Sequence, residues 1–396
     1  MSFDIPDLPL TADAIPDLEE IPDESGGCRV YAFIGSGQGG GRLAESFYKL
    51  GYKKTLVCNT AQQDLRSLSV LPEDQKILLD AGVSGAGKDM RVGEEAMLKG
   101  QHRLYESMGR KFGKVDHILI CVGAGGGSGG GSSLVLLETA TKYLKYIGYD
   151  DAERRVGFIV TLPTNGECAS PGVGTNSKFL VEELSKYAQG GQLSPLIVVD
   201  NDKIKRLFPD LTVKEFWGKI NDTVAGLFHI FNILPTKETN YTVFDAADYA
   251  SLMQAGGFMI MGSTTVKECK PADAIANALR TNLERTLLAS GFNLRTATHA
   301  AAVVVGGSTV FDSVPGLMMS IEGGFDALAV LTANALVHRG VYEDAKDRLT
   351  VYTLVGGLKA PTERIAQLTR FQGVQGDDRS GSKMPAPSFG NRLYQE

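Results

Sequence analysis

The sequence has few of the side chains that bind metals or form disulfides. Its 396 residues include five cysteines, five histidines and one tryptophan. The cysteines are odd in number and scattered, which predicts reduced thiols in a cytosolic protein. The histidines are scattered as well, and no two of them have the helical spacing of a ligand pair. This pattern argues against a metal site built from histidine or cysteine.

Long apolar runs and a basic, apolar leader are also missing. No run reaches the roughly 18 residues of a membrane span, so we expect no membrane span and no signal peptide. The net charge is −6, and eight acids precede the first base, Arg29. The remainder therefore carries about +2, too little for a general nucleic-acid binder. We expect residues 1–28 to be an acidic, disordered extension and 372–396 a disordered tail.

What the sequence has in abundance is glycine, and seven of the nine residues at 123–131 are glycine. An apolar run at 117–122 precedes this stretch and a helical apolar pattern follows it. Backbone N–H groups without nearby Cβ atoms can approach an anion, and a helix N-terminus adds a favourable dipole. Ser128 offers a hydroxyl, as do Ser132 or Ser133 at the helix start. A flexible linker is the alternative, but linkers rarely join a buried strand to a helix.

Strand and helix patterns alternate between residues 29 and 200, which predicts a doubly wound parallel sheet. The polar and glycine-rich stretches follow the expected strands, so they should gather at one rim of the sheet. The expected strands are 29–34, 54–59, 117–122, 156–162 and 195–200, and the rim stretches are 35–42, 59–64, 123–131, 163–167 and 200–202.

A long helix is expected at 212–232, followed by a loop at 235–245 and a second α/β region. The patterns there predict strands at 257–265, 299–306 and 349–355, and helices at 248–255, 272–289, 325–339 and 361–371. We therefore divide the chain into an extension (1–28), a nucleotide-binding domain (29–210), a central helix (211–235), a second α/β domain (236–358) and a C-terminal helix with tail (359–396).

Two common nucleotide motifs fit the sequence poorly. Residues 35–40 fit the G-x-G-x-x-G pattern of dinucleotide folds, but Asn59 stands where an acid should hold the ribose. Residues 82–89 are a near miss to a P-loop, because Asp89 replaces the Mg²⁺-binding Ser or Thr and no clear strand precedes it. An NAD-dependent oxidoreductase would also leave the second glycine loop without a role.

Several of these segments, taken in order, resemble the tubulin/FtsZ superfamily of polymerising GTPases. Residues 123–131 are similar to its G-G-G-T-G-[ST]-G phosphate loop, residues 59–65 to its N-T-D-x-Q-x-L stretch, and residues 245–248 to its D-x-x-D loop. The family spacing between a proline and a glutamate is also matched, by Pro163 and Glu167. An Asn-Asp pair of the family is matched by Asn201 and Asp202. The resemblance covers residues 29 to 358 and implies a Rossmann-like GTPase domain joined by a central helix to a smaller α/β domain.

The resemblance implies that GTP or GDP is bound together with Mg²⁺. Asp64 lies in the stretch that the family places near the metal, an aromatic ring at 217 would stack on guanine, and Asn221 would read its edge. The implied nucleotide-binding residues are Gly37, Gln38, Gly39, Gly40, Gly41, Arg42, Asn59, Gly85, Ala86, Gly87, Gly125, Gly126, Gly127, Ser128, Gly129, Glu167, Asn201, Trp217 and Asn221.

The sequence also departs from the FtsZ pattern. Thr164 and Gly166 replace phenylalanines, Pro171 replaces an arginine, and Val243 replaces an asparagine. Arg42 stands where the first loop often has asparagine. These differences look more like the TubZ-type tubulins of plasmids and phages than a cell-division FtsZ, although residues 385–389 faintly resemble the FtsZ partner peptide.

In this family, head-to-tail assembly places the D-x-x-D loop of one subunit on the nucleotide of the next. The resemblance therefore implies a filament-forming GTPase in a prokaryotic or phage-infected cytoplasm, with Asp245 and Asp248 as catalytic residues. Either aspartate can instead cap the following helix. An adaptor would bind the acidic N-terminus or the tail, and any contact with nucleic acid would pass through it. A nucleotide-binding structural protein with little hydrolysis is the alternative.

Overall fold

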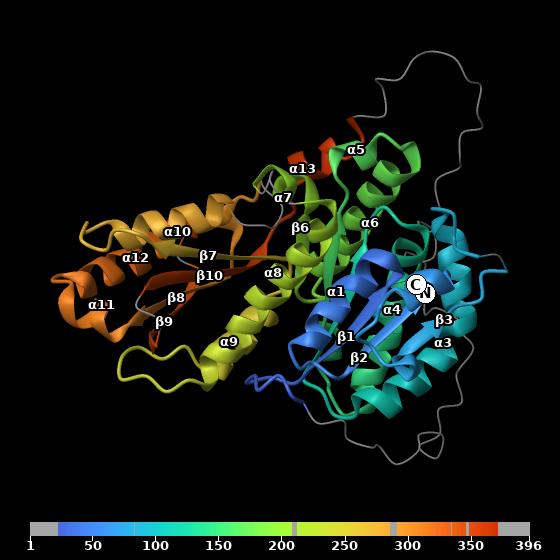
Figure 1. Cartoon of the computed structure of the whole chain (residues 1–396), viewed down its shortest axis with the longest axis horizontal. Coiled ribbons are helices and arrows are strands. Elements are labelled where there is room, and N and C mark those ends of the chain that lie inside the picture. Colours follow the sequence, from blue (N-terminus) through green and yellow to red (C-terminus); the bar gives the residue numbers. More distant parts are fainter. Residues whose placement is uncertain are drawn as a thin grey trace.

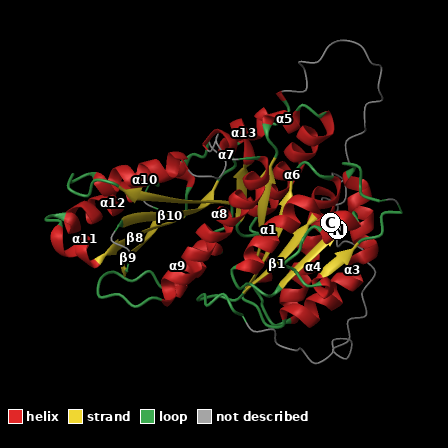
Figure 2. Cartoon of the chain, in the orientation of Figure 1, coloured by secondary structure: helices red, strands yellow, loops and turns green. Residues whose placement is uncertain are grey.

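The computed structural model describes residues 23–370 except 83, 208–211, 286–290, 334 and 346–347. The expected disordered tail and most of the acidic extension therefore lie outside the described residues. The described chain forms one ten-stranded sheet with helices on its faces (Figures 1 and 2). Its strands are β1 (Tyr31–Ser36), β2 (Thr55–Asn59), β3 (Lys76–Leu78), β4 (His117–Gly123), β5 (Val156–Leu162), β6 (Leu196–Asp200), β7 (Phe258–Val266), β8 (His299–Gly307), β9 (Leu336–Asp344) and β10 (Leu349–Leu358).

The first part of the sheet is parallel, with the order β3-β2-β1-β4-β5-β6. Its strands are almost entirely buried, as continuous apolar runs between two helical layers should be. This confirms the expected doubly wound arrangement. The helices are α1 (Gly37–Lys49), α2 (Gln62–Arg66), α3 (Met90–Phe112), α4 (Gly127–Tyr146), α5 (Asn165–Cys168), α6 (Pro171–Gln189) and α7 (Asn201–Leu207).

Two glycine-rich stretches that were expected to be loops are largely helical. α1 begins at Gly37 and α4 begins at Gly127, so most of each stretch forms the first turn of a helix. Close packing explains why glycine is required there. A Cβ atom on Gly40 would lie 2.0 Å from the carbonyl oxygen of Cys121, so only glycine lets α1 approach β4 this closely. The short strand β3 was also missed by the sequence analysis.

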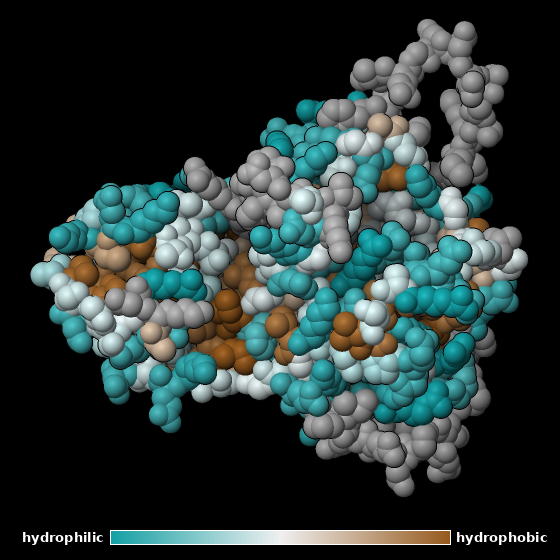
Figure 3. All heavy atoms as spheres, in the orientation of Figure 1, coloured by the Kyte–Doolittle hydropathy of each residue, from teal (hydrophilic) through white to brown (hydrophobic). Residues whose placement is uncertain are grey.

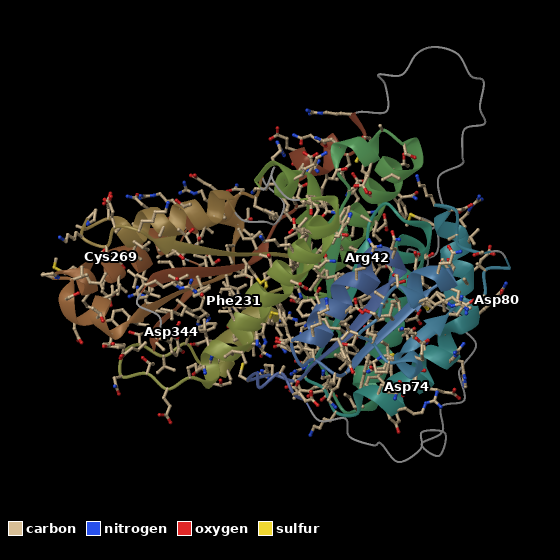
Figure 4. The ribbon with its side chains drawn as sticks, viewed as in Figure 1. Arg42, Asp74, Asp80, Phe231, Cys269 and Asp344 are labelled. Atoms are coloured by element: carbon tan, nitrogen blue, oxygen red, sulfur yellow. The ribbon has the colours of Figure 1, made fainter. Side chains whose placement is uncertain are left out.

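The long helix α8 (Val213–Ile233) joins the two parts of the molecule, as expected. On one side, its Phe228 ring packs edge-on against Tyr31 of β1, with ring centroids 5.0 Å apart. On the other, Phe231 meets Tyr352 of β10 at 6.3 Å. Figure 4 labels Phe231 between the two lobes, and Figure 3 shows hydrophobic residues gathered there. The helix is therefore part of a core that continues across both lobes.

The second part of the sheet has the order β7-β10-β8-β9, and β6 pairs with β7 through Leu196–Phe258 and Ile197–Met259. Strand β10 runs antiparallel to both of its neighbours, whereas β9 is parallel to β8. The remaining helices are α9 (Ala246–Met253), α10 (Ala274–Arg285), α11 (Ser308–Ser313), α12 (Leu317–Leu331) and α13 (Thr362–Gln367).

The expected helix at 325–339 is wrong. The segment divides into the end of α12, which stops at Leu331, and the start of β9 at Leu336. Its alanine and leucine content favours a helix locally, but pairing of Leu336–Asp344 with β8 imposes an extended backbone. In the described part of the chain, none of the helices has the length and apolar character that crossing a bilayer requires.

Candidate functional site

Two helices begin at the carboxyl edge of the parallel strands, where ligands bind in such sheets. Strand β1 ends at Ser36, directly before α1, and β4 ends at Gly123, four residues before α4. The N-cap residues are Ser36 and Gly126, and neither provides a side-chain cap. The first N–H groups of an α-helix have no partner within the helix, so both helix starts can donate to an anion.

Glycine brings these two helix starts into contact. A Cβ atom on Gly37 would lie 3.0 Å from the backbone nitrogen of Gly129. A Cβ atom on Gly129 would lie 2.9 Å from the carbonyl oxygen of Ser36. The expected first and central glycine stretches therefore form one continuous surface of backbone atoms.

Part of the third glycine-rich stretch, residues 84–89, lies against the same surface. A Cβ atom on Gly127 would lie 2.8 Å from the backbone nitrogen of Asp89 and 2.9 Å from Cβ of Ala86. Helix α3, which follows this stretch, crosses α4 through glycines. A Cβ atom on Gly93 would lie 2.2 Å from the carbonyl oxygen of Gly127, and one on Gly131 would lie 2.0 Å from that of Met90. This crossing fixes residues 84–89 beside the start of α4.

Asp64 is held at the same rim by two amides. Its Oδ1 atom accepts a hydrogen bond from Nε2 of Gln38 at 3.1 Å, and its Oδ2 atom accepts one from Nδ2 of Asn59 at 3.0 Å. Asn59 is itself fixed, because its Oδ1 atom accepts the N–H of Ala61 at 3.1 Å. Three of the sequence-predicted residues, on α1, β2 and α2, therefore form one cluster around a carboxylate.

The hydroxyl of Ser128 is bonded at this rim, next to Asn59, whereas those of Ser132 and Ser133 are bonded inside the domain. Ser128 Oγ lies 2.6 Å from Oγ1 of Thr60, which follows β2. Ser132 bonds to Ser36 at 2.7 Å, and Ser133 donates to the carbonyl oxygen of Gly129 at 2.8 Å. Both of these serines are fully buried within α4. The expectation that either one donates to an anion at the helix start is therefore wrong.

On the side of the rim that follows β5 and β6, Asp202 of α7 is bonded to the start of α5. Its carboxylate accepts the backbone N–H and the side-chain amide of Asn165, at 2.9 and 3.0 Å. The neighbouring Asn201 is buried, and its Oδ1 atom has no hydrogen-bond partner among the described residues. A buried acceptor without a donor is costly in a folded protein. This atom therefore fits a ligand that brings an N–H or O–H group.

Glu167 has a local role in the structure. Its Oε2 atom accepts hydrogen bonds from the backbone N–H and the hydroxyl of Thr164, at 2.8 and 2.9 Å. Together these residues form the capping box of α5. The glutamate is nevertheless exposed at the rim, so its binding to a ribose stays a prediction.

Trp217 and Asn221 lie one turn apart on α8 and therefore share a face of that helix. The next residue, Asp222, accepts a hydrogen bond from Ser46 of α1 at 2.7 Å, which ties α8 to α1. Asn221 is buried, and the half-buried Trp217 ring packs edge-on against Phe216 at 5.0 Å. Figure 4 labels Arg42, which lies on α1. Stacking of Trp217 on a base and the role of Arg42 stay predictions.

Asp245 and Asp248 form the capping box of α9. They therefore cap this helix, which the sequence left open as an alternative to a catalytic role. Oδ1 of Asp245 accepts the N–H groups of Ala247 and Asp248, each at 2.8 Å. Oδ2 of Asp248 accepts the N–H of Asp245 at 3.2 Å. Asp245 is exposed and Asp248 is half-buried. Val243, where the family pattern has asparagine, is also exposed.

The structure does not bring this aspartate pair to the glycine surface of the same chain. The ring of Tyr249 on α9 lies 6.4 Å from that of Tyr31, the first residue of β1. The glycine surface begins after Ser36, the last residue of β1. A strand rises roughly 3.3 Å per residue, so β1 separates the two sites by about 17 Å.

The site contains two further polar groups, Thr60 and Lys88, that were not expected from the sequence. Thr60 bonds to Ser128, and its carbonyl oxygen accepts the N–H of Gly85 at 3.2 Å. Lys88 points its ammonium group at Ser170 Oγ, at 3.3 Å, next to Pro171, where the family has arginine. The sequence did contain features that indicate both residues. Thr60 directly follows an expected strand, and Lys88 is a cation within a glycine-rich stretch.

The residues present fit a nucleotide with its Mg²⁺. Two uncapped helix starts, a glycine surface and the exposed Lys88 suit a polyphosphate. The free Oδ1 atom of Asn201 suits a hydroxyl or base N–H group. Mg²⁺ usually takes one or two carboxylates together with phosphate oxygens and water, so the single carboxylate of Asp64 is a sufficient protein ligand.

Comparison with known proteins is consistent with this geometry. Residues 30–209 match the model of the Tubulin/FtsZ family, GTPase domain, and residues 230–369 match that of the TubZ-like C-terminal domain. The tubulin-like protein TubZ of Bacillus cereus is 25% identical over 268 residues, which cover 63% of this chain and 58% of that protein. The tubulin-like protein CetZ of Thermococcus kodakarensis is 27% identical over 340 residues, which cover 82% of this chain and 81% of that protein.

Solved structures share the fold. A GTPγS-form protofilament of TubZ from Bacillus thuringiensis serovar israelensis aligns with a TM-score of 0.74 at 22% identity, covering 87% of this chain and 91% of that chain. A GTPγS-bound protofilament of CetZ2 from Haloferax volcanii aligns with a TM-score of 0.70, also at 22% identity, covering 86% and 97%.

Proposed function

Since this chain belongs to the tubulin/FtsZ superfamily of GTPases, we propose that it binds and hydrolyses GTP and assembles head-to-tail into filaments. The observation that supports this proposal best is that the chain contains two incomplete half-sites and that these lie far apart. The glycine surface lies after the carboxyl end of β1, and the Asp245–Asp248 capping box packs near its amino end. Stacking one subunit on the next brings the two half-sites together, and repeating such a non-closing contact builds a filament.

The starts of α1 and α4 would hold the phosphates through backbone N–H groups, and Ser128 and Lys88 would add side-chain donors. Asp64 would hold Mg²⁺, which when bound neutralises charge on the β- and γ-phosphates. Gln38 and Asn59 fix the Asp64 carboxylate for that task. Asn201 would accept a hydrogen bond from the nucleoside, and Trp217 and Asn221 would contact the base.

Asp245 and Asp248 of the adjacent subunit would complete the site. Cleavage of the γ-phosphate depends on placing the attacking water and on the charges around it. At the described rim, Asp64 would be occupied by Mg²⁺, and the Asp202 carboxylate is bonded to Asn165. The exposed Asp245 carboxylate uses only its Oδ1 atom in the capping box, which leaves Oδ2 to orient the water.

The test is GTP turnover by Asp245→Ala filaments. Removing a positioned general base typically costs 10²–10⁴-fold, so we expect turnover per assembled subunit to fall by at least about 100-fold. GTP affinity should be unchanged, because Asp245 is remote from the nucleotide of its own chain. Asp312→Ala, a change at an exposed aspartate on α11, is the matched control.

The capping box favours one competing function. Because both aspartates stabilise the start of α9, the chain would need them even as a nucleotide-binding structural protein that hydrolyses little GTP. In that case wild-type filaments would show almost no turnover, and Asp245→Ala would lower stability without a specific effect on hydrolysis. The process that such filaments serve, whether DNA segregation, positioning or cell division, would depend on their partners.

A further inference from the structure

A histidine from a distant strand contacts one of the two aspartates. His338 lies on β9, and its Nδ1 atom is 2.8 Å from Oδ1 of Asp248. Its Nε2 atom is 3.1 Å from the hydroxyl of Ser251, one turn further along α9. The side chain of His338 is 12% exposed and that of Asp248 is 29% exposed. The imidazole therefore connects the Asp248 carboxylate to the body of α9 from largely within the protein.

The hydrogen bonds around this histidine call for a proton on each ring nitrogen. The Ser251 hydroxyl donates its only proton to the carbonyl oxygen of Asp248, at 2.8 Å. It can therefore only accept from His338, which makes Nε2 a donor. The ionised Asp248 carboxylate is an acceptor, which makes Nδ1 a donor as well. The imidazolium satisfies all three contacts together, and the neutral ring loses one of them.

The groups around His338 are consistent with a positive charge there. Asp248 and Asp245 supply negative charge from the start of α9. His299 on β8 stacks on His338 with ring centroids 6.5 Å apart. Burial, together with the charge of His338, lowers the pKa of His299. The hydroxyl of Tyr342 on β9 is bonded to the backbone of Phe244.

An arginine and an aromatic ring complete these surroundings. Arg339, which follows His338 on β9, pairs with Glu322 and Asp326 of α12. The ring of Phe244, in the loop before α9, lies 6.5 Å from that of His338. Among the described residues, His338 is thus the side chain that pairs with the Asp248 carboxylate.

We propose that His338, with Ser251, is a positioning residue for Asp248 in GTP hydrolysis. Oδ2 of Asp248 is fixed by the N–H of Asp245, and the imidazolium fixes Oδ1. Both aspartates of the loop are thereby held in one arrangement before a neighbouring subunit docks. This inference rests on the proposed function, in which the same loop acts on the nucleotide of the adjacent subunit.

The test compares His338→Gln and His338→Ala with the wild type. We measure GTP turnover per sedimented subunit, GTP affinity of the free subunit and thermal unfolding. Glutamine keeps an amide donor but cannot bridge Asp248 and Ser251 at once, nor carry charge. Removing a group that orients a functional ligand typically costs 10–100-fold, so both variants should turn over GTP at least about tenfold more slowly. GTP affinity should stay within about twofold of the wild-type value, because His338 is remote from the nucleotide of its own chain.

The matched control is His102→Gln. His102 also pairs with a carboxylate, Glu106 on α3, at 3.4 Å, but both side chains are well exposed and the pair is remote from α9. Its turnover should equal that of the wild type. Should His338→Ala fold poorly in the unfolding measurement, two milder variants provide the same comparison. His338→Gln replaces the ring with a side chain that cannot make both contacts at once, and Ser251→Ala removes only the contact to Nε2.

The split between turnover and GTP affinity provides a readout that a purely structural role would not move. A general loss of structure would lower both, whereas the proposed role lowers turnover alone. The inference is wrong if His338→Gln retains at least half of the wild-type turnover. Asp245→Ala, measured in parallel, separates the two hypotheses: if it retains turnover, the proposed function itself fails.

Discussion

Arg364 of α13 forms a two-point ion pair with Asp200, 164 positions away in the sequence. The guanidinium Nε atom lies 2.6 Å from Oδ2 of Asp200, and Nη2 lies 2.9 Å from Oδ1. Both side chains are buried, with 6% and 1% of their surface exposed. Asp200 also accepts the N–H of Asp202 at 3.1 Å and directly precedes Asn201. The C-terminal helix therefore anchors the rim of the candidate nucleotide site.

Breaking this pair should be costly. Arg364→Met leaves the Asp200 carboxylate buried and unpaired, which typically destabilises a protein by about 3–5 kcal/mol. Arg339→Met is the matched control, because Arg339 is 38% exposed and its ion pairs contribute about 1 kcal/mol or less. Urea unfolding measures both changes. Equal losses in the two variants would show that Asp200 is not fixed by Arg364.

The glycine crossing of α3 and α4 makes a second prediction. A Cβ atom on Gly131 would lie 2.0 Å from the carbonyl oxygen of Met90, so Gly131→Ala must move one helix backbone. We expect a loss of at least about 2 kcal/mol in the free energy of unfolding, as for other overpacked cores. GTP affinity should fall as well, because residues 84–89 would shift away from α4.

Gly323→Ala is the control for this substitution. Gly323 is exposed on α12, and a Cβ atom there would meet no atom within 4 Å. Alanine in an open helical position typically stabilises by about 0.5–1 kcal/mol. If Gly131→Ala proved as stable as Gly323→Ala, the two helices would not be in the close contact described here.

Stability should depend on His117 below neutral pH. This histidine at the start of β4 is buried, and its Nε2 atom donates to the carbonyl oxygen of Ser194 at 2.7 Å. Burial lowers its pKa from 6.5 to about 4. Between these two values the unfolded chain binds a proton that the folded chain does not. The free energy of unfolding should therefore fall as the pH is lowered from 6.5 to 4, by about 3 kcal/mol in total from this group.

His117→Gln isolates that contribution. Its amide can still donate to Ser194, but it does not titrate. Urea unfolding at several pH values should show a shallower acid slope for His117→Gln than for the wild type. His102→Gln, at an exposed position on α3, should retain the wild-type slope. Parallel slopes for wild type and His117→Gln would contradict a buried, neutral imidazole.

Apart from β3, the sequence predicted the parallel half of the sheet well, because each of the other strands is a continuous apolar run ended by a polar or glycine-rich stretch. It failed where tertiary packing decided the outcome. Residues 336–344 become β9 through pairing with β8. Residues 37–41 become helical because Gly40 lets α1 lie directly on β4. Neither partner can be read from the local pattern.

The site was predictable to the extent that it follows the ends of strands. Gln38, Asn59, Asp64 and Ser128 do lie at one rim, as the alternation of strands and helices predicted. Ser132 and Ser133 were misjudged because burial inside α4 depends on which face of the helix packs. The contacts of Asp248 with His338 and of Asp200 with Arg364 join elements from different parts of the chain, so local spacing gave no sign of them.

The most direct test of the account measures GTP turnover per subunit across a dilution series, with polymer quantified by sedimentation in the same samples. Because the glycine surface and the Asp245–Asp248 loop lie at opposite ends of β1, a lone subunit cannot bring its own aspartates to its own nucleotide. We predict that turnover is close to zero in dilute samples without polymer and rises in proportion to sedimented protein. Turnover per subunit that is constant across the series, down to samples containing only monomer, would contradict the account.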